Sequence, residues 1–252
     1  MRDLVDGIFY RTRTGCPWRD IPTRYGPWHA AYALFAQLTA AGVWNRILTV
    51  VNLMTATPEE LLSFVAIDSG TARASVHAAG ARRDSFIRHP DEPVDHGLGR
   101  SRGGFSSKFH IAASHTGHLL GVVITAGQKG DSPQLFNVLD KINIPTDSGR
   151  IRKTPAMVAA DCAYGSRDNR DKLRARKIAT VIPETSQVKD ARKRRGSKGG
   201  RPRKLDRVEY ARRNCVECLI GRLKQHRAVA LRVDKLAVHF ESTVIIAGIR
   251  QA

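Results

Sequence analysis

The sequence is short of cysteine, of long apolar runs and of acidic residues. Four cysteines in 252 residues are too few for a disulfide framework. Cys215 and Cys218 form a C-x-x-C, but no second pair follows at zinc-site spacing, so we expect reduced, packed thiols. No apolar run reaches the roughly 18 residues of a membrane span, and the first residues lack the apolar stretch of a secretory signal. We therefore expect a cytoplasmic protein with no membrane partner.

The shortage of acids leaves a large positive charge. The chain has 42 Lys and Arg against 23 Asp and Glu, a formal net charge of +19. Repulsion on this scale destabilises a folded chain unless a polyanion offsets it, and nucleic acid is the commonest such partner. A merely basic, solvated surface is the alternative that charge alone leaves open.

Residues 1–58 have the pattern of a small helical unit. Apolar residues recur at helical spacing near the start, three prolines then interrupt the chain, and helical spacing resumes. All three tryptophans, Trp18, Trp28 and Trp44, fall in this unit. We expect them to form its core rather than a platform on which bases stack.

From residue 59 onward the chain changes to short apolar runs separated by turns and helices. Strands in succession, followed by strands alternating with helices, predict a mixed α/β sheet. The runs FVAID (64–68) and MVAAD (157–161) both end in an aspartate, Asp68 and Asp161. Ligands of open α/β sheets gather at the C-terminal ends of strands, although aspartates also begin ordinary turns there.

A strongly basic segment follows the last predicted strand. Residues 186–204 carry nine Lys or Arg, one acid and a single large apolar residue, Val188. Such a stretch buries too little apolar surface to offset the conformational entropy that it would lose on becoming ordered. We therefore expect a basic flexible segment over 186–205, whose arginines include Arg194 and Arg195, that contacts DNA phosphates.

One acid, Glu217, stands in the basic helical segment YARRNCVECLIGRLKQHR (210–227). At about 100° per residue, Tyr210, Arg213, Glu217 and Lys224 lie on one stripe of the helix. An apolar stripe beside it can pack on the sheet. Taken alone, the helix is equally well explained as a solvated basic face with an incidental glutamate.

The three acids Asp68, Asp161 and Glu217 together predict a divalent-metal site. Packed closely without a cation, they would repel one another and raise one another's pKa. Two Mg²⁺ ions, or Mn²⁺ in their place, would remove that penalty, because these cations prefer oxygen ligands. A two-metal site can act on both the attacking and the departing oxygen of a phosphodiester. In so basic a chain, this predicts chemistry on nucleic-acid phosphates.

A family resemblance rests on six segments, which are LVDGIFYRTRTGCPWRDIPTRYGPW, IDSGTARASVHAAGARR, GLGRSRGGFSSKFHIAAS, GQKGDSPQ, ADCAYGSRDNRDKLRARKI and YARRNCVECLIGRLKQHRAVALRVDKLA. In this order they cover nearly the whole chain and resemble successive blocks of DDE transposases of the bacterial insertion-sequence-five group. The resemblance implies a ribonuclease H-like catalytic domain over 59–252, with Asp68, Asp161 and Glu217 as catalytic acids and metal ligands. It also implies that the helical unit over 1–58 helps to bind the element's ends.

The same resemblance implies a reaction and its partners. Metal-dependent hydrolysis at the ends of an insertion sequence would be followed by strand transfer into target DNA. The partners would be double-stranded DNA, as terminal inverted repeats and as target, and further copies of the chain in a homo-oligomer at the nucleoid. The residues that we expect to contact DNA are Arg100, Arg102, Lys108, Tyr210, Arg213, Lys224, Arg227, Arg194 and Arg195.

Two rival interpretations stay open. One is a ribonuclease H-like nuclease that hydrolyses DNA without joining strands. The other is a truncated, noncatalytic DNA-binding remnant that represses transposition. Departures from the family pattern bear on the second, because similar proteins carry a longer N-terminal segment, a bulkier residue in place of Gly70, His in place of Ser75 and Asp in place of Ser114.

Overall fold

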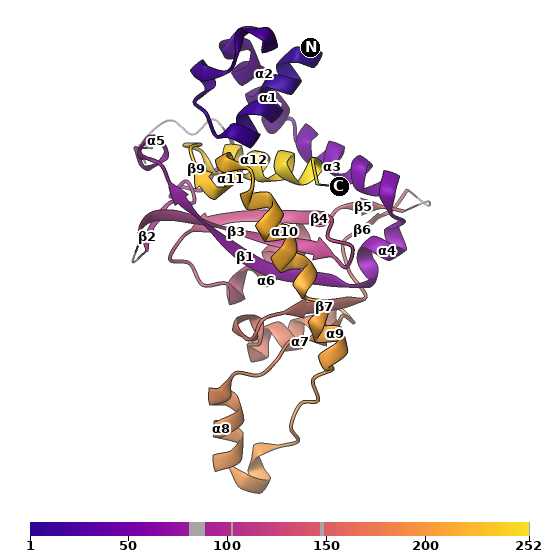
Figure 1. Ribbon diagram of the computed structural model, residues 1–252. Helices are drawn as coiled ribbons and strands as arrows, with labels where there is room; N and C mark the ends of the chain where they lie inside the picture. The colour runs from indigo at the N-terminus through magenta and orange to yellow at the C-terminus, as the bar shows by residue number, and fades with distance from the viewer. Residues whose placement is uncertain (81–88, 102, 147–148, 252) are drawn as a thin grey trace.

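The computed structural model describes residues 1–80, 89–101, 103–146 and 149–251, and its centre is a mixed β-sheet with helices on both faces (Figure 1). The strands of this sheet are β1 (Val65–Ala74), β2 (Gly99–Ser101), β3 (Gly104–Ser114), β4 (Leu119–Ala126), β7 (Met157–Ala160), β8 (Ala179–Val181) and β9 (Leu231–Arg232). A separate short hairpin joins β5 (Ile144–Pro145) to β6 (Ile151–Arg152).

The strand order confirms the predicted ribonuclease H-like sheet. The main path is β2-β3-β1-β7-β8, with β4 paired to β3 and β9 paired to the end of β1. Strand β3 runs antiparallel to both β1 and β4, whereas β7 is parallel to β1 and β8 is parallel to β7. Three antiparallel strands therefore lie beside two parallel ones, as a run of strands followed by strand–helix alternation predicts.

The helices bury the two faces of the sheet separately. Because side chains alternate along a strand, Val65 and Ile67 enter one core and Ala66 enters the other. The helices after the first strand are α5 (Val76–Ala79), α6 (Leu135–Asp140), α7 (Arg167–Ala175), α8 (Ser186–Arg194), α9 (Arg207–Ala211), α10 (Asn214–Lys224), α11 (Arg227–Ala230) and α12 (Ala237–Ile249), with 3-10 turns η3 (Ser132–Gln134) and η4 (Cys162–Tyr164). Helices α10 and α12 cover one face, and α6 and α7 cover the other.

The N-terminal residues form helices, as predicted; the first three share a core with one face of the sheet, and the fourth buries Leu61 and Leu62 in the core of the other face. They are α1 (Arg2–Thr14), α2 (Trp28–Ala40), α3 (Val43–Thr55) and α4 (Pro58–Ser63), with 3-10 turns η1 (Trp18–Asp20) and η2 (Thr23–Tyr25). Trp44 is buried in this shared core and Trp18 packs against it. Trp28 is 38% exposed, with the Arg19 guanidinium 5.4 Å from its ring centroid, so its predicted place in the core is wrong.

Among the described residues, no single helix is both long and apolar enough to cross a bilayer, although the bent pair α2 and α3 reaches that length and composition when taken together.

Strand β1 is longer than its apolar run suggests. We expected Asp68 at a strand end, but β1 continues to Ala74, and Asp68 pairs with Ile111 in the middle of the β1–β3 ladder. The small polar residues after Asp68 stay in the strand because β3 supplies hydrogen-bonding partners as far as Arg73. Asp161 does follow the last residue of β7, as predicted.

The basic segment over 186–205, which we expected to be flexible, contains regular structure. Residues Ser186–Arg194 form helix α8, followed by the 3-10 turn η5 (Gly196–Gly199). The Thr185 hydroxyl caps α8 by accepting from the Val188 N–H, and Arg192 on α8 donates to Glu184. A cap and a charge partner just outside the basic stretch thus supply the stabilisation that its own composition lacks.

A close approach between β1 and β3 gives a stability prediction. A Cβ at Gly70 would lie 2.2 Å from the ring of Phe109, its fully buried cross-strand partner. We expect Gly70→Ala to lower the free energy of unfolding by about 1 to 3 kcal/mol, because the ring must move within a packed core. Urea denaturation measures the change. Gly221→Ala is the control, since nothing lies within 4 Å of that position and alanine favours helix α10. Equal stability of Gly70→Ala and the parent chain would refute this packing argument.

Candidate active site

The sheet and helix α10 bring the three predicted acids to one region. Strands β1 and β7 are parallel with Ile67 opposite Ala160, so Asp68 and Asp161 are the next residues along neighbouring strands. Glu217 lies in the first turn of α10, which packs its apolar stripe against the sheet beside β1 and β3. Residues that are far apart in sequence therefore lie close together beside the central strand β1.

Arg213 joins two of these acids directly. Its Nη1 donates to Asp68 Oδ2 at 2.9 Å, and its Nη2 donates to Glu217 Oε1. The Arg213 side chain is 15% exposed, while those of Asp68 and Glu217 are 23% and 48% exposed. We predicted that Tyr210, Arg213, Glu217 and Lys224 lie on one stripe of a single helix. Arg213 and Glu217 of that set form an ion pair, but the helix is interrupted at residues 212 and 213, between α9 and α10.

The protonation equilibria at the site reflect crowded negative charge. Burial raises the pKa of Asp68 above its ordinary value and the Asp161 carboxylate raises it further, although the Ser69 N–H and Arg213 oppose the shift. Burial disfavours the charge on Arg213, but the carboxylates of Asp68 and Glu217 outweigh this and raise its pKa. One guanidinium thus serves as the cation among these acids.

The Asp161 side chain also stabilises the local backbone. Its Oδ1 accepts the Ala163 N–H at 2.9 Å and so caps the turn η4. This contact fixes where the carboxylate leaves the end of β7.

A fourth acid, Asp131, lies close by, and sequence reasoning gave it no role. It accepts from Ser69 Oγ and from Lys108 Nζ, both at 3.0 Å, and His110 Nδ1 lies 3.6 Å away. Burial lowers the pKa of His110 to about 4, so this imidazole is neutral near pH 7. Burial, together with the charges of Asp131, Asp68 and Asp161, raises the pKa of the Tyr164 phenol. The signal in the sequence was the segment GQKGDSPQ, which contains Asp131.

The acids are not arranged as a finished metal centre. Within the ranges that the structure describes, no group of three or more His, Cys, Asp or Glu side chains is placed to hold a metal ion. The Arg213 guanidinium lies between Asp68 and Glu217. The donor set nevertheless suits a hard divalent cation, since the side chains are carboxylates and one positive group already lies among them.

The residues predicted to contact DNA are spread over several elements. Arg213 and Lys108 are engaged with acids, and the Tyr210 ring centroid lies 5.6 Å from the Arg213 guanidinium. Arg102 lies outside the described residues. The exposed members of the set are Arg100 on β2, Lys224 at the end of α10, Arg227 at the start of α11, Arg194 at the end of α8 and Arg195 just after it.

Family models match most of the chain. A model described as "Transposase DDE domain" matches residues 59–249. The chain belongs to the DDE transposases. A second model, "Putative transposase of IS4/5 family", matches residues 1–48, so the two matches confirm the predicted family and support the IS4/5 type.

The sequence is similar to individual proteins, one of which is named as a transposase. The transposase is 30% identical, over 142 residues, to a putative transposase for insertion sequence element IS6501 from Brucella ovis, a match that covers 56% of this chain and 94% of the relative. It is 35% identical over 89 residues to the uncharacterized protein y4sN of Sinorhizobium fredii, covering 35% and 67% of the two chains. Among solved structures, it resembles the Mos1 strand transfer complex at 10% identity and a TM-score of 0.29, covering 87% of this chain and 75% of that one.

Proposed function

We propose that this transposase hydrolyses the phosphodiester at the ends of its insertion sequence and then transfers the freed strand into target DNA, using Asp68, Asp161 and Glu217. The observation that carries the proposal is the ion-paired arrangement in which Arg213 joins Asp68 of the sheet to Glu217 of α10, with Asp161 on the neighbouring strand. Such a juxtaposition of acids from distant segments has no evident packing purpose, since its members are charged and partly exposed.

The roles proposed for the acids follow from their positions. Asp68 and Asp161 would hold a divalent cation between adjacent strands, and Glu217 would complete the ligand set from the helix. When bound, two Mg²⁺ ions, or Mn²⁺, would activate the attacking oxygen and stabilise the departing one. Arg213 would then turn from the carboxylates to the DNA phosphate, where a guanidinium offsets the charge that develops at the scissile group.

Other parts of the proposal concern DNA. The exposed Arg100, Lys224, Arg227, Arg194 and Arg195 would contact phosphates and give salt-sensitive affinity. The N-terminal helices would contribute to binding of the terminal inverted repeats. Because both ends of an element must be joined, we propose a homo-oligomer on paired ends.

The test uses DNA from the inverted repeats that the proposal places on either side of the gene. With Mg²⁺, the purified chain should nick at the element's end and expose a 3′-hydroxyl. On a precleaved end, that hydroxyl should attack a target phosphodiester, join to its phosphorus and release the target's own 3′-hydroxyl. Nicking without joining would identify a nuclease, and binding without nicking would identify a noncatalytic remnant. Either outcome overturns the proposal.

Arg213 gives a prediction in which the apparent affinity for Mg²⁺ rises while the maximal cleavage rate falls. We expect Arg213→Gln to reduce the Mg²⁺ concentration for half-maximal cleavage roughly two- to fivefold, because the guanidinium no longer competes for Asp68 and Glu217. The maximal rate should fall roughly a hundredfold, because the phosphate loses a cationic partner. A Mg²⁺ titration of the cleavage rate measures both quantities.

The matched control is Arg212→Gln, which removes the same charge from a neighbouring residue that pairs with Glu209 instead. Arg212→Gln should leave both quantities near the parent values. An unchanged rate, or a higher Mg²⁺ requirement, in Arg213→Gln would contradict the role proposed for Arg213.

A further inference from the structure

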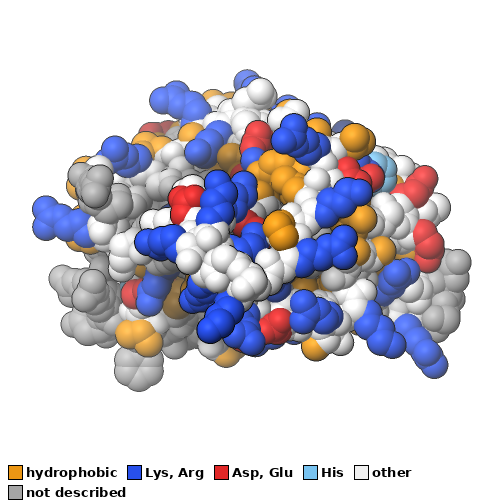
Figure 2. Space-filling view, turned by 90° about the horizontal axis from the view of Figure 1, so that it is seen from below, with side chains coloured by type: hydrophobic (Ala, Val, Ile, Leu, Met, Phe, Trp, Pro, Cys, Tyr) orange, Lys and Arg blue, Asp and Glu red, His pale blue; other side chains and the backbone are white. Residues whose placement is uncertain are grey.

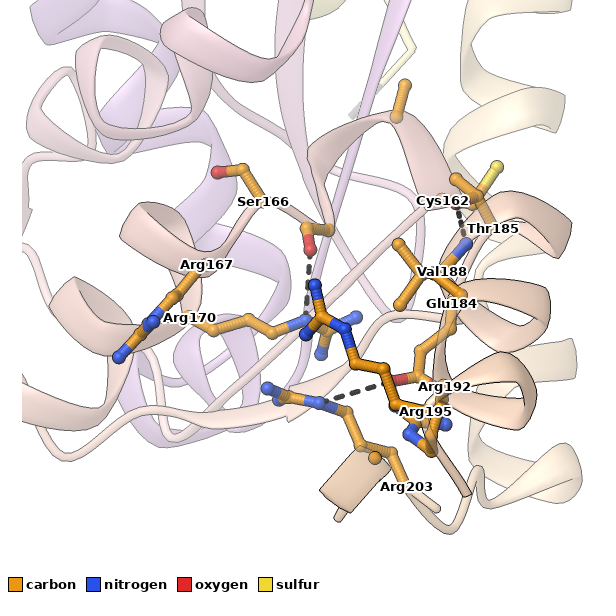
Figure 3. Close-up of a pocket in the computed structure, with 14 residues that line it drawn as sticks. Cys162, Ser166, Arg167, Arg170, Glu184, Thr185, Val188, Arg192, Arg195 and Arg203 are labelled. Atoms are coloured by element: carbon orange, nitrogen blue, oxygen red, sulfur yellow. Dashed lines mark hydrogen bonds and ion pairs between the residues drawn. The ribbon is translucent and has the colours of Figure 1, made fainter. Parts of the chain in front are cut away.

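A cavity whose charged lining is mostly arginine lies beside the candidate active site. It has a volume of about 700 Å³ and is bounded by the turn after Asp161, by α7 and by α8 (Figure 3). We call it the arginine pocket, because its charged lining consists of five arginines and one glutamate, which are Arg167, Arg170, Arg192, Arg195, Arg203 and Glu184. The pocket lies at the α8 end of the molecule, on a face where Lys and Arg visibly outnumber acids (Figure 2).

Two of the charged groups hold the walls together. Glu184, whose side chain is only 7% exposed, accepts from Arg192 on α8 at 2.7 Å and lies 3.3 Å from Nε of Arg203. The hydrogen bond from Arg192 lowers the pKa of Glu184, which therefore stays ionised. Arg170 donates to the backbone carbonyls of residues 165, 182 and 183 and so joins the start of α7 to the chain after β8. These contacts shape the pocket without neutralising it.

Surplus positive charge remains after these pairings. The single carboxylate is shared by Arg192 and Arg203. In the part of the chain that the structure describes, Arg195 is exposed and has no ion-pair partner. Helices α7 and α8 also both begin at the lining, with Ser166 and Thr185 as their capping residues, which adds partial positive charge. The net positive charge of the pocket therefore favours binding of an anion.

The chemistry of the lining specifies the kind of anion. All of its cations are arginines, and the planar guanidinium matches phosphate oxygens in pairs, which the point charge of lysine does not. The lining starts at Cys162 and Ala163, the two residues after Asp161, and the Ala163 N–H donates to Asp161. A nucleic-acid backbone bound in this pocket would therefore continue directly from the site of the acids around Asp161.

We propose that the arginine pocket binds the phosphodiester backbone of DNA next to the bond being cut or joined, with Arg195 and Arg203 as phosphate ligands. The inference rests on the proposed function of the neighbouring acids and adds a path for the strand. The backbone has two sources of the same chemistry, which are the DNA flanking the element before cleavage and the target DNA during joining.

The experiment compares Arg195→Gln/Arg203→Gln with Arg174→Gln/Arg176→Gln, a control that removes the same charge from the other end of α7, outside the lining. Binding is measured by fluorescence anisotropy over a salt series on four probes: an unrelated duplex, the element end with its flank, the element end cut at the cleavage position, and that cut-end complex with target duplex added. Thermal melting checks that each variant is folded.

On each probe whose backbone reaches the pocket, Arg195→Gln/Arg203→Gln should bind roughly tenfold more weakly for every phosphate contact that is lost. The slope of log affinity against log salt concentration should fall by about 0.9 for each of those contacts. The control should bind like the parent. Loss confined to the flanked end identifies flanking DNA, and loss confined to the target probe identifies target DNA. Arg195→Lys should recover part of the affinity, because it restores charge without the paired geometry.

Parent-like binding of the pocket variant on all four probes would overturn the inference, as would a parent chain that binds none of them. If that variant binds like the parent while the parent cleaves DNA in an Asp161-dependent way, the pocket inference and the phosphate contact proposed for Arg195 fail, while the proposed cleavage activity survives. If affinity depends on the pocket but the parent does not cleave, the proposed function fails and the pocket inference survives.

Discussion

Replacing Asp161 with asparagine is expected to lower the rate of Mg²⁺-dependent DNA cleavage by about a thousandfold or more, because metal-assisted phosphoryl chemistry loses several kcal/mol of transition-state stabilisation. Asparagine is almost the same size and can still cap the turn η4 by accepting the Ala163 N–H. The fold should therefore persist. Single-turnover cleavage of an end-labelled duplex measures the rate.

The control for this prediction is Asp140→Asn, which neutralises an exposed carboxylate that pairs with Arg176 at the end of α6. It should cleave at the parent rate. Glu217→Gln should share the defect of Asp161→Asn, since both acids are assigned to one site. Cleavage by Asp161→Asn within a few-fold of the parent rate would rule out this carboxylate as a metal ligand.

The second large effect concerns stability rather than chemistry. Asp234 Oδ1 accepts from Arg11 Nη2 at 2.7 Å, and its Oδ2 accepts from Thr243 at 2.8 Å. The Arg11 and Asp234 side chains are each 3% exposed, and the contact joins α1 to the loop before α12. We expect Asp234→Asn to lower the free energy of unfolding by about 3 to 5 kcal/mol at pH 7, because Arg11 is left as an uncompensated buried charge.

Urea denaturation at several pH values checks this second prediction. Burial by itself would raise the pKa of Asp234, but Arg11 and Thr243 outweigh it and the pKa is lowered in the folded protein. The contribution to stability should therefore be full above the unfolded pKa of about 3.9 and decline only as the pH falls further, through the lowered folded-state value.

Two comparisons make the stability prediction specific. Asp168→Asn, which breaks an exposed pair with Lys172, should change stability by less than about 1 kcal/mol. Replacing both members of the buried pair, as in Arg11→Met/Asp234→Leu, should recover part of the loss because no charge is left buried. A cost no larger for Asp234→Asn than for Asp168→Asn would contradict the account of this contact.

Local patterns predicted those features that depend on local physics. The apolar runs FVAID and MVAAD identified β1 and β7, and Asp161 was correctly placed at a strand end. The start of α9 follows from a side-chain cap, because Asp206 accepts from the N–H groups of Val208 and Glu209. Because caps and apolar periodicity depend on residues a few positions apart, both can be recognised in a short stretch of sequence.

Features that depend on distant partners were missed. The full length of β1 depends on pairing with β3, and α8 is stabilised by Glu184, which lies outside the basic stretch. The Arg11–Asp234 pair joins residues that are 223 positions apart, so no local sequence pattern predicts it. Asp131 was overlooked for the same reason, since its nearness to Asp68 arises only through Ser69 and the fold of the sheet.

The central claim is that the carboxylates of Asp68, Asp161 and Glu217 bind divalent metal together. Affinity cleavage tests it most directly, because Fe²⁺ bound in place of Mg²⁺ reduces added hydrogen peroxide to hydroxide and hydroxyl radical, and the radical cuts the polypeptide next to the metal. Mapping the fragments should show cuts close to residues 68, 161 and 217, suppressed by excess Mg²⁺ and lost in Asp68→Asn. Cuts that miss any of the three segments, or that persist in Asp68→Asn, would contradict the claim.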